Sequence, residues 1–212
     1  MNKYAILGAS GHGKVVADAI FNFNKDIVIL FFDDAFSTIK NNEHWPVEGS
    51  FHDLVERIDE FDGVVVAIGN NSIRYEKQRE LVAQGAKIIS IIHPKAIVSP
   101  FTRIGSGVVV LAGAIINAGA MIGDACIINS NAVVEHDCLL QAAVHVSPGA
   151  NIAGGVTIGF SSWIGIGASV KQLISIGNNV TVGAGAAVIN DIADNVTVVG
   201  VPAKPLAGKK IC

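Results

Sequence analysis

Aliphatic residues recur every six positions along most of this chain, from residue 91 to residue 192. A small or aliphatic residue follows four places after each of them, and glycine is frequent directly after them. A six-residue period fits neither an α-helix nor a plain two-residue alternation, and it predicts a parallel β-helix of hexapeptide turns. We expect each aliphatic side chain to point inward from a short strand, which a tight turn with glycine follows. The aliphatic positions are Ile92, Val98, Ile104, Val110, Ile116, Ile122, Ile128, Val134, Leu140, Val146, Ile152, Ile158, Ile164, Val170, Ile176, Val182 and Val188.

Stacking follows from this repeat. With three hexapeptides to each triangular coil, residues 18 positions apart lie above one another, about 4.8 Å apart. The flat faces of such a prism suit a long thin ligand or a second copy of the same prism. After residue 192 the repeat stops, and we expect a last strand over 196–201 and a tail that covers the open end of the β-helix.

The first 90 residues alternate between strand-like and helix-like patterns. Buried strands are predicted at 4–7, 27–32, 63–68 and 87–91. Helices are predicted directly after residue 13, at 51–58, and in the segment from after Asn71 to Gln84, where Gly85 would be the C-cap. The polar stretch 37–43 is predicted to be a loop. This alternation indicates a small parallel, Rossmann-like sheet covered by helices. The predicted domains are therefore 1–90, with an α/β fold, and 91–212, with the β-helix and its tail.

The composition limits the binding partners and the cellular location that we expect. The 212 residues carry a formal charge of −3, which offers no basic field for nucleic acid or an acidic membrane. No apolar run approaches the ~20 residues that span a bilayer, and the N-terminus lacks a signal-peptide pattern. Two of the three cysteines, Cys126 and Cys138, fall on the small inward position of the repeat. We therefore expect free thiols and a reducing, cytoplasmic location.

A glycine-rich loop, Gly8-Ala9-Ser10-Gly11-His12-Gly13, lies between the first predicted strand and helix. Backbone N–H groups at such a junction favour a phosphate. The spacing matches neither the G-x-G-x-x-G fingerprint nor a P-loop, so both a nucleotide site and a tight packing turn fit it. Asp33 and Asp34, after the second strand, are placed to contact a ribose or base; solvated turn carboxylates are the alternative.

One hexapeptide carries three ionisable groups together, Glu135, His136 and Asp137. A histidine can take a proton near neutral pH, and an adjacent carboxylate can orient its ring. The alternative is a turn histidine on a wet surface. His145, half a coil further and expected near an edge of the prism, is a second polar candidate. Gly154, 18 residues after His136, could offer a backbone N–H to an acyl oxygen, as an oxyanion hole does.

Taken together, these motifs resemble those of the hexapeptide-repeat acyltransferases that use acetyl-CoA, and more closely the bacterial sugar acetyltransferases of the PglD/NeuD type. The resemblance covers nearly the whole chain. It rests on residues 8–13, Asp33-Asp34, Ala67-Ile68-Gly69-Asn70-Asn71 with Arg74, Ile92-His93-Pro94, Glu135-His136-Asp137 and Val199-Gly200-Val201-Pro202-Ala203-Lys204.

The resemblance implies a left-handed β-helix, a homotrimer, and acetyl-CoA bound along the cleft between neighbouring prisms, with no metal. It implies a role for each candidate residue. His136 would be the general base and Asp137 its orienting acid, although members of this type can carry the longer glutamate there. His145, Gly154, Ala203 and Lys204 would contact acetyl-CoA, and Gly11, His12, Asp33, Asp34 and Asn129 would bind the nucleotide-linked sugar.

The predicted reaction is acetyl transfer from acetyl-CoA to the 4-amino group of a UDP-linked amino-deoxy-sugar by direct attack. One alternative is O-acetylation of sialic acid or a similar sugar hydroxyl. Another is a non-catalytic β-helix that serves as a trimerisation or sugar-binding module, which the ionisable cluster disfavours. A metal-dependent hydrolase ranks lowest, because only His136 and His145 lie well inside the repeat.

Overall fold

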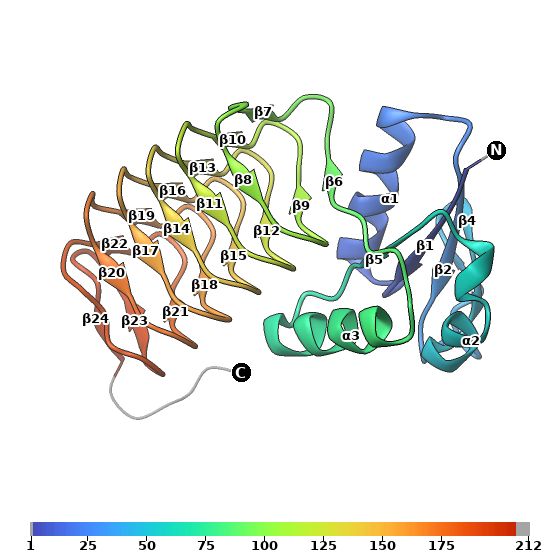
Figure 1. The fold of residues 1–212 in the computed structure, drawn as a ribbon. Helices are drawn as coiled ribbons and strands as arrows, with labels where there is room; N and C mark the ends of the chain where they lie inside the picture. The colour runs from blue at the N-terminus through green and yellow to red at the C-terminus, as the bar shows by residue number, and fades with distance from the viewer. Residues whose placement is uncertain (1, 207–212) are drawn as a thin grey trace. The chain divides into compact units, whose positions relative to one another are not determined.

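The computed structural model describes residues 2–206 and divides into two compact units, one up to residue 94 and one from residue 95 on. The first unit is built on a sheet of order β3-β4-β2-β1-β5, parallel except for β3 (Figure 1). Its elements are β1 (Lys3–Leu7), α1 (Gly11–Phe23), β2 (Val28–Phe32), β3 (Asn41–Asn42), β4 (Trp45–Gly49), α2 (Phe51–Glu56), the 3₁₀ turn η1 (Ile58–Glu60), β5 (Gly63–Val66), α3 (Asn71–Ala83) and β6 (Ile91–Ile92).

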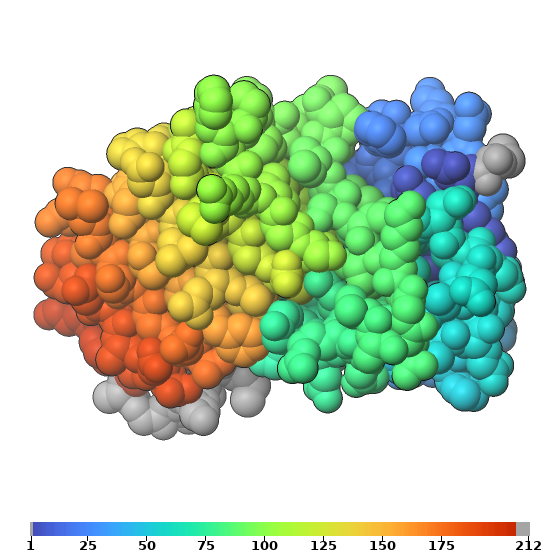
Figure 2. Space-filling view, viewed as in Figure 1, coloured from blue at the N-terminus to red at the C-terminus, as the bar shows by residue number. Residues whose placement is uncertain are grey.

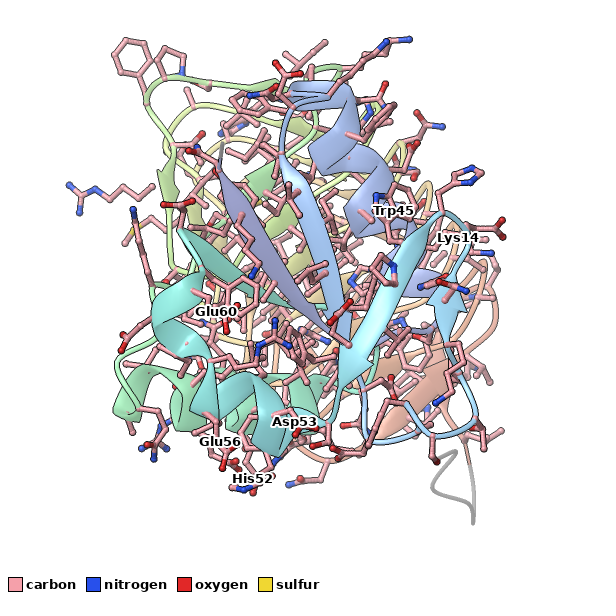
Figure 3. All side chains as sticks on the ribbon, turned by 90° about the vertical axis from the view of Figure 1, so that its right-hand side faces the viewer. Lys14, Trp45, His52, Asp53, Glu56 and Glu60 are labelled. Atoms are coloured by element: carbon pink, nitrogen blue, oxygen red, sulfur yellow. The ribbon has the colours of Figure 1, made fainter. Side chains whose placement is uncertain are left out.

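Two predictions for this unit were wrong in detail. The stretch 37–43 is not all loop, because Asn41–Asn42 pairs antiparallel with β4. The strand predicted at 87–91 is interrupted: a single bridge joins Ile88 to Val64, and only Ile91 lies in a strand, β6. The ion pair of Lys14 with Glu43 ties α1 to the unpredicted hairpin, next to Trp45 (Figure 3).

Helices cover both faces of this sheet. On one face Leu54 of α2 and Leu81 of α3 pack in a common core with Ala5, Leu7 and Phe32. Residues alternate sides along a strand, so Phe31 faces the other way, towards α1. There a Cβ added at Gly13 would lie 2.9 Å from the Phe31 ring. The α/β fold is therefore confirmed, with α1 and the loop before it at the end of β1.

The second unit is a left-handed parallel β-helix of two-residue strands. The first face holds β7 (Ile97–Val98), β10 (Ile115–Ile116), β13 (Val133–Val134), β16 (Asn151–Ile152), β19 (Ser169–Val170) and β22 (Ala187–Val188). The second holds β8 (Arg103–Ile104), β11 (Met121–Ile122), β14 (Leu139–Leu140), β17 (Thr157–Ile158) and β20 (Ser175–Ile176). The third holds β9 (Val109–Val110), β12 (Ile127–Ile128), β15 (His145–Val146), β18 (Trp163–Ile164), β21 (Thr181–Val182), β23 (Thr197–Val199) and β24 (Lys204–Pro205).

The predicted 18-residue stacking is present throughout. Ile116 pairs with Val134, and Val134 pairs with Ile152 on the next coil. Their side chains lie in one buried aliphatic core that runs along the prism. In the space-filling view the successive coils form adjacent bands whose colour runs from green to red (Figure 2).

The turns differ from the prediction in where glycine is needed. Glycines directly after the aliphatic position, such as Gly123, do not adopt the left-handed conformation; a Cβ there would lie 2.6 Å from the Ala142 nitrogen of the next coil. In the turns from residue 107 to residue 185 the left-handed residue comes two positions later, as at Gly107, Asn131 and Asp137. Where glycine follows the aliphatic position directly it allows close stacking of the coils, whereas the later position has a positive φ, which glycine adopts most readily but other residues also adopt here.

The end of the described chain folds back on the β-helix. The last predicted strand is found as β23, which pairs with β21 in parallel and with β24 antiparallel. The Ala203 N–H donates to the Ala187 carbonyl and the Leu206 N–H to the Thr197 carbonyl. No helix within residues 2–206 has both the length and the apolar character needed to cross a bilayer.

Candidate functional site

The strongest candidate for chemistry is the turn between β13 and β14, where His136 and Asp137 are adjacent. The Nδ1 atom of His136 lies 2.9 Å from Oδ2 of Asp137, and their side chains are 65% and 74% exposed. An ionised carboxylate only accepts hydrogen bonds, so Nδ1 carries a hydrogen. In the neutral tautomer the lone pair is then on Nε2, which is turned away from the carboxylate.

The backbone holds this pair in place. Asp137 adopts the left-handed conformation with φ 59°, which aspartate tolerates better than most residues. Its Oδ1 atom lies over Gly119 on the preceding coil, where a Cβ would approach to 2.5 Å. Because Gly119 has no side chain, the Asp137 carboxylate has room on the preceding coil in the position from which its Oδ2 contacts the His136 ring.

Gly154 lies against the other edge of the imidazole, as the stacking rule predicts. A Cβ at Gly154 would be 2.5 Å from Nε2 and 2.6 Å from Cε1 of His136. The N–H of Gly155 is already used, since it donates to the His136 carbonyl. Within residues 2–206 no such partner is found for the Gly154 N–H, so this donor of the residue stacked on His136 remains for a ligand.

Glu135, the third ionisable residue of this hexapeptide, has a hydrogen-bond partner that the sequence analysis did not predict. Asn117 donates from Nδ2 to Oε2 of Glu135 over 2.8 Å. The two residues are 18 apart, so the stacking rule could have found the pair. Glu135 is therefore held by the coil below and does not contribute to the contact between His136 and Asp137.

His145 belongs to a second group on the third face. It lies within strand β15, so the expectation that it sits near an edge of the prism is wrong. Asn129 contacts its Nε2 through Nδ2 at 3.2 Å, and the Trp163 ring stacks on it with centroids 5.6 Å apart. Asn129 and His145, predicted separately, are thus in contact, and Trp163 was not predicted.

The predicted glycine-rich loop is shorter than expected, because α1 begins at Gly11, which is exposed. Gly8 has φ +110°, and the Ala9 N–H donates to Oδ2 of Asp33 over 2.8 Å. Asp33 also accepts from the Ala35 N–H through Oδ1, 2.9 Å away. Asp33 therefore fixes the loop to the end of β2, which is a structural role; its predicted contact with the nucleotide-linked sugar stays a prediction.

Asp34 and His12 differ in their surroundings. The carboxylate of exposed Asp34 accepts from the Phe51 N–H at the start of α2, over 3.0 Å. His12 is partly buried, and its Nε2 is a buried atom that has no hydrogen-bond partner among the described residues. Burial, and then the charge of Arg74, lower the pKa of His12 to about 4. At neutral pH His12 is thus an uncharged group with one nitrogen left for a ligand.

Arg74 explains the motif that follows β5. Its guanidinium is almost fully buried and donates to the carbonyls of Ile68 and Gly69 and to Oδ1 of Asn71. Asn70 caps α3 by accepting from the Ile73 N–H. The loop is thereby held rigid by side chains from the first turn of its own helix.

The remaining predicted residues lie elsewhere in the second unit. Ala203 is partly buried against β22, and Lys204 is exposed in β24. The structure therefore does not bring them into contact with the pair of His136 and Asp137. Across residues 2–206, no group of three or more histidine, cysteine or acidic side chains is arranged to hold a metal ion.

Comparison with known proteins identifies the family. The PglD N-terminal domain family matches residues 3–81. The acetyltransferase domain of PglB from Neisseria gonorrhoeae FA1090, solved with acetyl coenzyme A, is 44% identical, with 97% of this chain and 100% of that one aligned and a TM-score of 0.93. The chain belongs to the PglD-type sugar N-acetyltransferases.

Two further members of this sugar N-acetyltransferase family have named substrates. A perosamine N-acetyltransferase from Caulobacter crescentus, solved with CoA and GDP-perosamine and with one histidine replaced by asparagine, is 37% identical over 98% of each chain, with a TM-score of 0.92. The UDP-N-acetylbacillosamine N-acetyltransferase of Bacillus subtilis is 41% identical over 114 residues, 53% of this chain. That match spans about half of the Bacillus enzyme, 52% of its length.

Proposed function

We propose that this protein transfers the acetyl group of acetyl-CoA to the 4-amino group of a UDP-linked amino-deoxy-sugar, with His136 as the general base. The observation that carries the proposal is the contact of His136 Nδ1 with Asp137, which in the neutral tautomer leaves Nε2 as a base, with Gly154 stacked against that edge of the ring. The UDP moiety is favoured by the bacillosamine enzyme of Bacillus, whereas the perosamine enzyme makes a GDP-linked sugar the competing choice.

In the proposed reaction the sugar nitrogen attacks the thioester carbonyl carbon directly. His136 Nε2 takes the proton that the nitrogen loses, and Asp137 stabilises the imidazolium that forms. The Gly154 N–H donates to the developing oxyanion. The C–S bond then breaks, the proton passes to the sulfur of CoA, and an amide remains on the sugar. No protein residue is acylated in this sequence.

The two substrates would engage different residues. Gly11, His12, Asp33 and Asp34 are proposed to bind the nucleotide-linked sugar, and Asn129 to reach the sugar from the β-helix. His145 is proposed to face the acetyl thioester, with Ala203 and Lys204 near the adenosine end of CoA. The support in this chain is the unpartnered Nε2 of neutral His12 and the placement of these residues on two separate units. The predicted cytoplasmic location stays a prediction.

We also propose a homotrimer. On the second face of the β-helix, Met121 and Leu139 are 43% and 40% exposed and line an open groove of about 560 Å³ together with Phe160. An apolar face of this kind is stabilised when a second copy covers it. Light scattering should give three times the 22.0 kDa chain mass; the mass of a single chain would contradict the trimer.

The reaction is tested by release of CoA thiol from acetyl-CoA with UDP- and GDP-linked 4-amino-sugars and with their 4-hydroxy counterparts. We expect turnover with the UDP-linked amine and a loss of about 10²–10⁴-fold in His136→Gln. His52→Gln is a matched control, because His52 is 79% exposed and also pairs with a carboxylate, that of Glu56. Turnover only with hydroxyl acceptors would replace the proposal by O-acetylation, and no turnover with any acceptor would leave a binding module.

A further inference from the structure

Four side chains on the third face of the β-helix are in contact with one another, and the proposed acetyl transfer assigns no role to two of them. Asn129, His145, Ser147 and Trp163 lie in or just after the adjacent strands β12, β15 and β18. Only two of them have proposed substrate contacts. The other two, Ser147 and Trp163, are connected to the His145 ring by the contacts described next.

Asn129 sets the protonation pattern of the His145 ring. The Ser130 N–H donates to Oδ1 of Asn129 over 2.8 Å, which identifies that atom as the oxygen of the amide. Nδ2 is then the donor towards Nε2 of His145, 3.2 Å away. His145 Nε2 must therefore accept, and in the neutral ring the hydrogen resides on Nδ1.

Trp163 sets the orientation of the same ring. It is the residue directly above His145 in the parallel register, and the two rings are 5° from parallel. Its indole Nε1–H donates to Oγ of Ser147 over 2.6 Å, and Ser147 is only 4% exposed. Trp163 itself is 46% exposed, so its hydrogen-bonded indole ring lies on the outside of the prism rather than in the core.

We propose that Trp163 is a positioning residue for the acetyl transfer, holding the His145 imidazole in one orientation while Asn129 holds it in one tautomer. Ser147 acts through Trp163 by fixing the indole. The inference rests on the proposed function, because it takes His145 to face the acetyl thioester. Trp163 would then act on the donor half of the reaction and leave binding of the nucleotide-linked sugar unchanged.

The test is a double-mutant cycle between Trp163→Leu and His145→Ala, with kcat and KM measured for both substrates. Loss of an aromatic pair is expected to lower kcat/KM for acetyl-CoA by about 2- to 12-fold, with KM for the sugar unchanged. Trp163→Phe, which keeps a ring, should recover part of the loss. In the His145→Ala background, Trp163→Leu should have no further effect, because its action passes through the imidazole.

Thr181→Val, one coil further in the same column, is the matched control and should keep the wild-type rate. Nitrogen-15 NMR of the His145 side chain gives a second readout: Nδ1 should carry the hydrogen in the wild type, and Trp163→Leu should change the ring shifts. If the wild-type enzyme is active but the effects of Trp163→Leu and His145→Ala are additive, the role of Trp163 is overturned and the proposed function stands. An inactive wild type would overturn the proposed function and this role together.

Discussion

Replacing Gly154 with alanine places one methyl group against the proposed base. The new Cβ would lie 2.5 Å from Nε2 and 2.6 Å from Cε1 of His136, whereas ordinary contact begins at 3.4 Å. The imidazole must therefore move by about 1 Å. Because the His136 side chain is 65% exposed, it can turn outward into solvent, and we expect the catalytic geometry to change while the β-helix does not.

A displacement of this size at a reacting group costs about 10²-fold in rate, which corresponds to about 2.7 kcal/mol of activation free energy. The free energy of unfolding should change by less than about 1 kcal/mol, as for other surface substitutions. The assay is kcat for CoA release at saturating substrates, together with a thermal melt of each variant.

Gly185→Ala is the matched control. Gly185 has φ +66° with open space around its Cβ position, and Ala125 and Ala143 already adopt the same left-handed backbone in this chain. It should keep the wild-type kcat. A wild-type kcat in Gly154→Ala would refute the placement of His136 as the base at this position. A large fall in melting temperature would show instead that the methyl group acts on the fold.

Three further predictions concern single side chains. The pKa of His12 is lowered from 6.5 to about 4, so between these pH values only the unfolded chain takes up the proton and the protein should become less stable as pH falls. The free energy of unfolding should fall by up to about 2 kcal/mol at pH ~5. Urea unfolding at pH ~5 and ~7.5 measures this loss, which should vanish in His12→Gln. Asp33→Asn should raise KM for the nucleotide-linked sugar and leave KM for acetyl-CoA unchanged, since Asp33 holds the Ala9 and Ala35 N–H groups; an unchanged sugar KM would contradict its place at that site. Asp137→Asn keeps a residue suited to φ 59° but loses the carboxylate, so kcat should fall by at least ~10-fold with little change in melting temperature, and an unaltered kcat would show that the pair is structural.

The repeat predicted the β-helix well because a six-residue period leaves one way to bury its aliphatic stripe. The same rule placed Gly154 on His136, since the register of stacked coils is set by the core. It could equally have placed Asn117 under Glu135 and Trp163 over His145. Those pairs were not predicted, because asparagine and tryptophan carry no ionisable group that marks them in the sequence.

Other features were beyond reach of the sequence for physical reasons. The β3 strand has only two residues, both asparagine, so neither its length nor its side chains mark it as a strand in the sequence. The left-handed residue of each turn is often not glycine, as at Leu173 and Asn179, so composition does not mark it. Handedness came from the family resemblance, because a six-residue period is the same in either hand. The lowered pKa of His12 depends on burial and on Arg74, which is distant in sequence.

The central claim is that His136 transfers a proton during acetylation of a sugar amine, and product analysis tests it most directly. Wild type and His136→Asn would be incubated with carbonyl-labelled ¹³C-acetyl-CoA and a UDP-linked 4-amino-sugar, with the labelled product followed by NMR. The account predicts a labelled amide at the 4-amino nitrogen, formed about 10²–10⁴-fold more slowly by the variant. A labelled ester on a hydroxyl, or an amide formed equally fast without the imidazole, would contradict it.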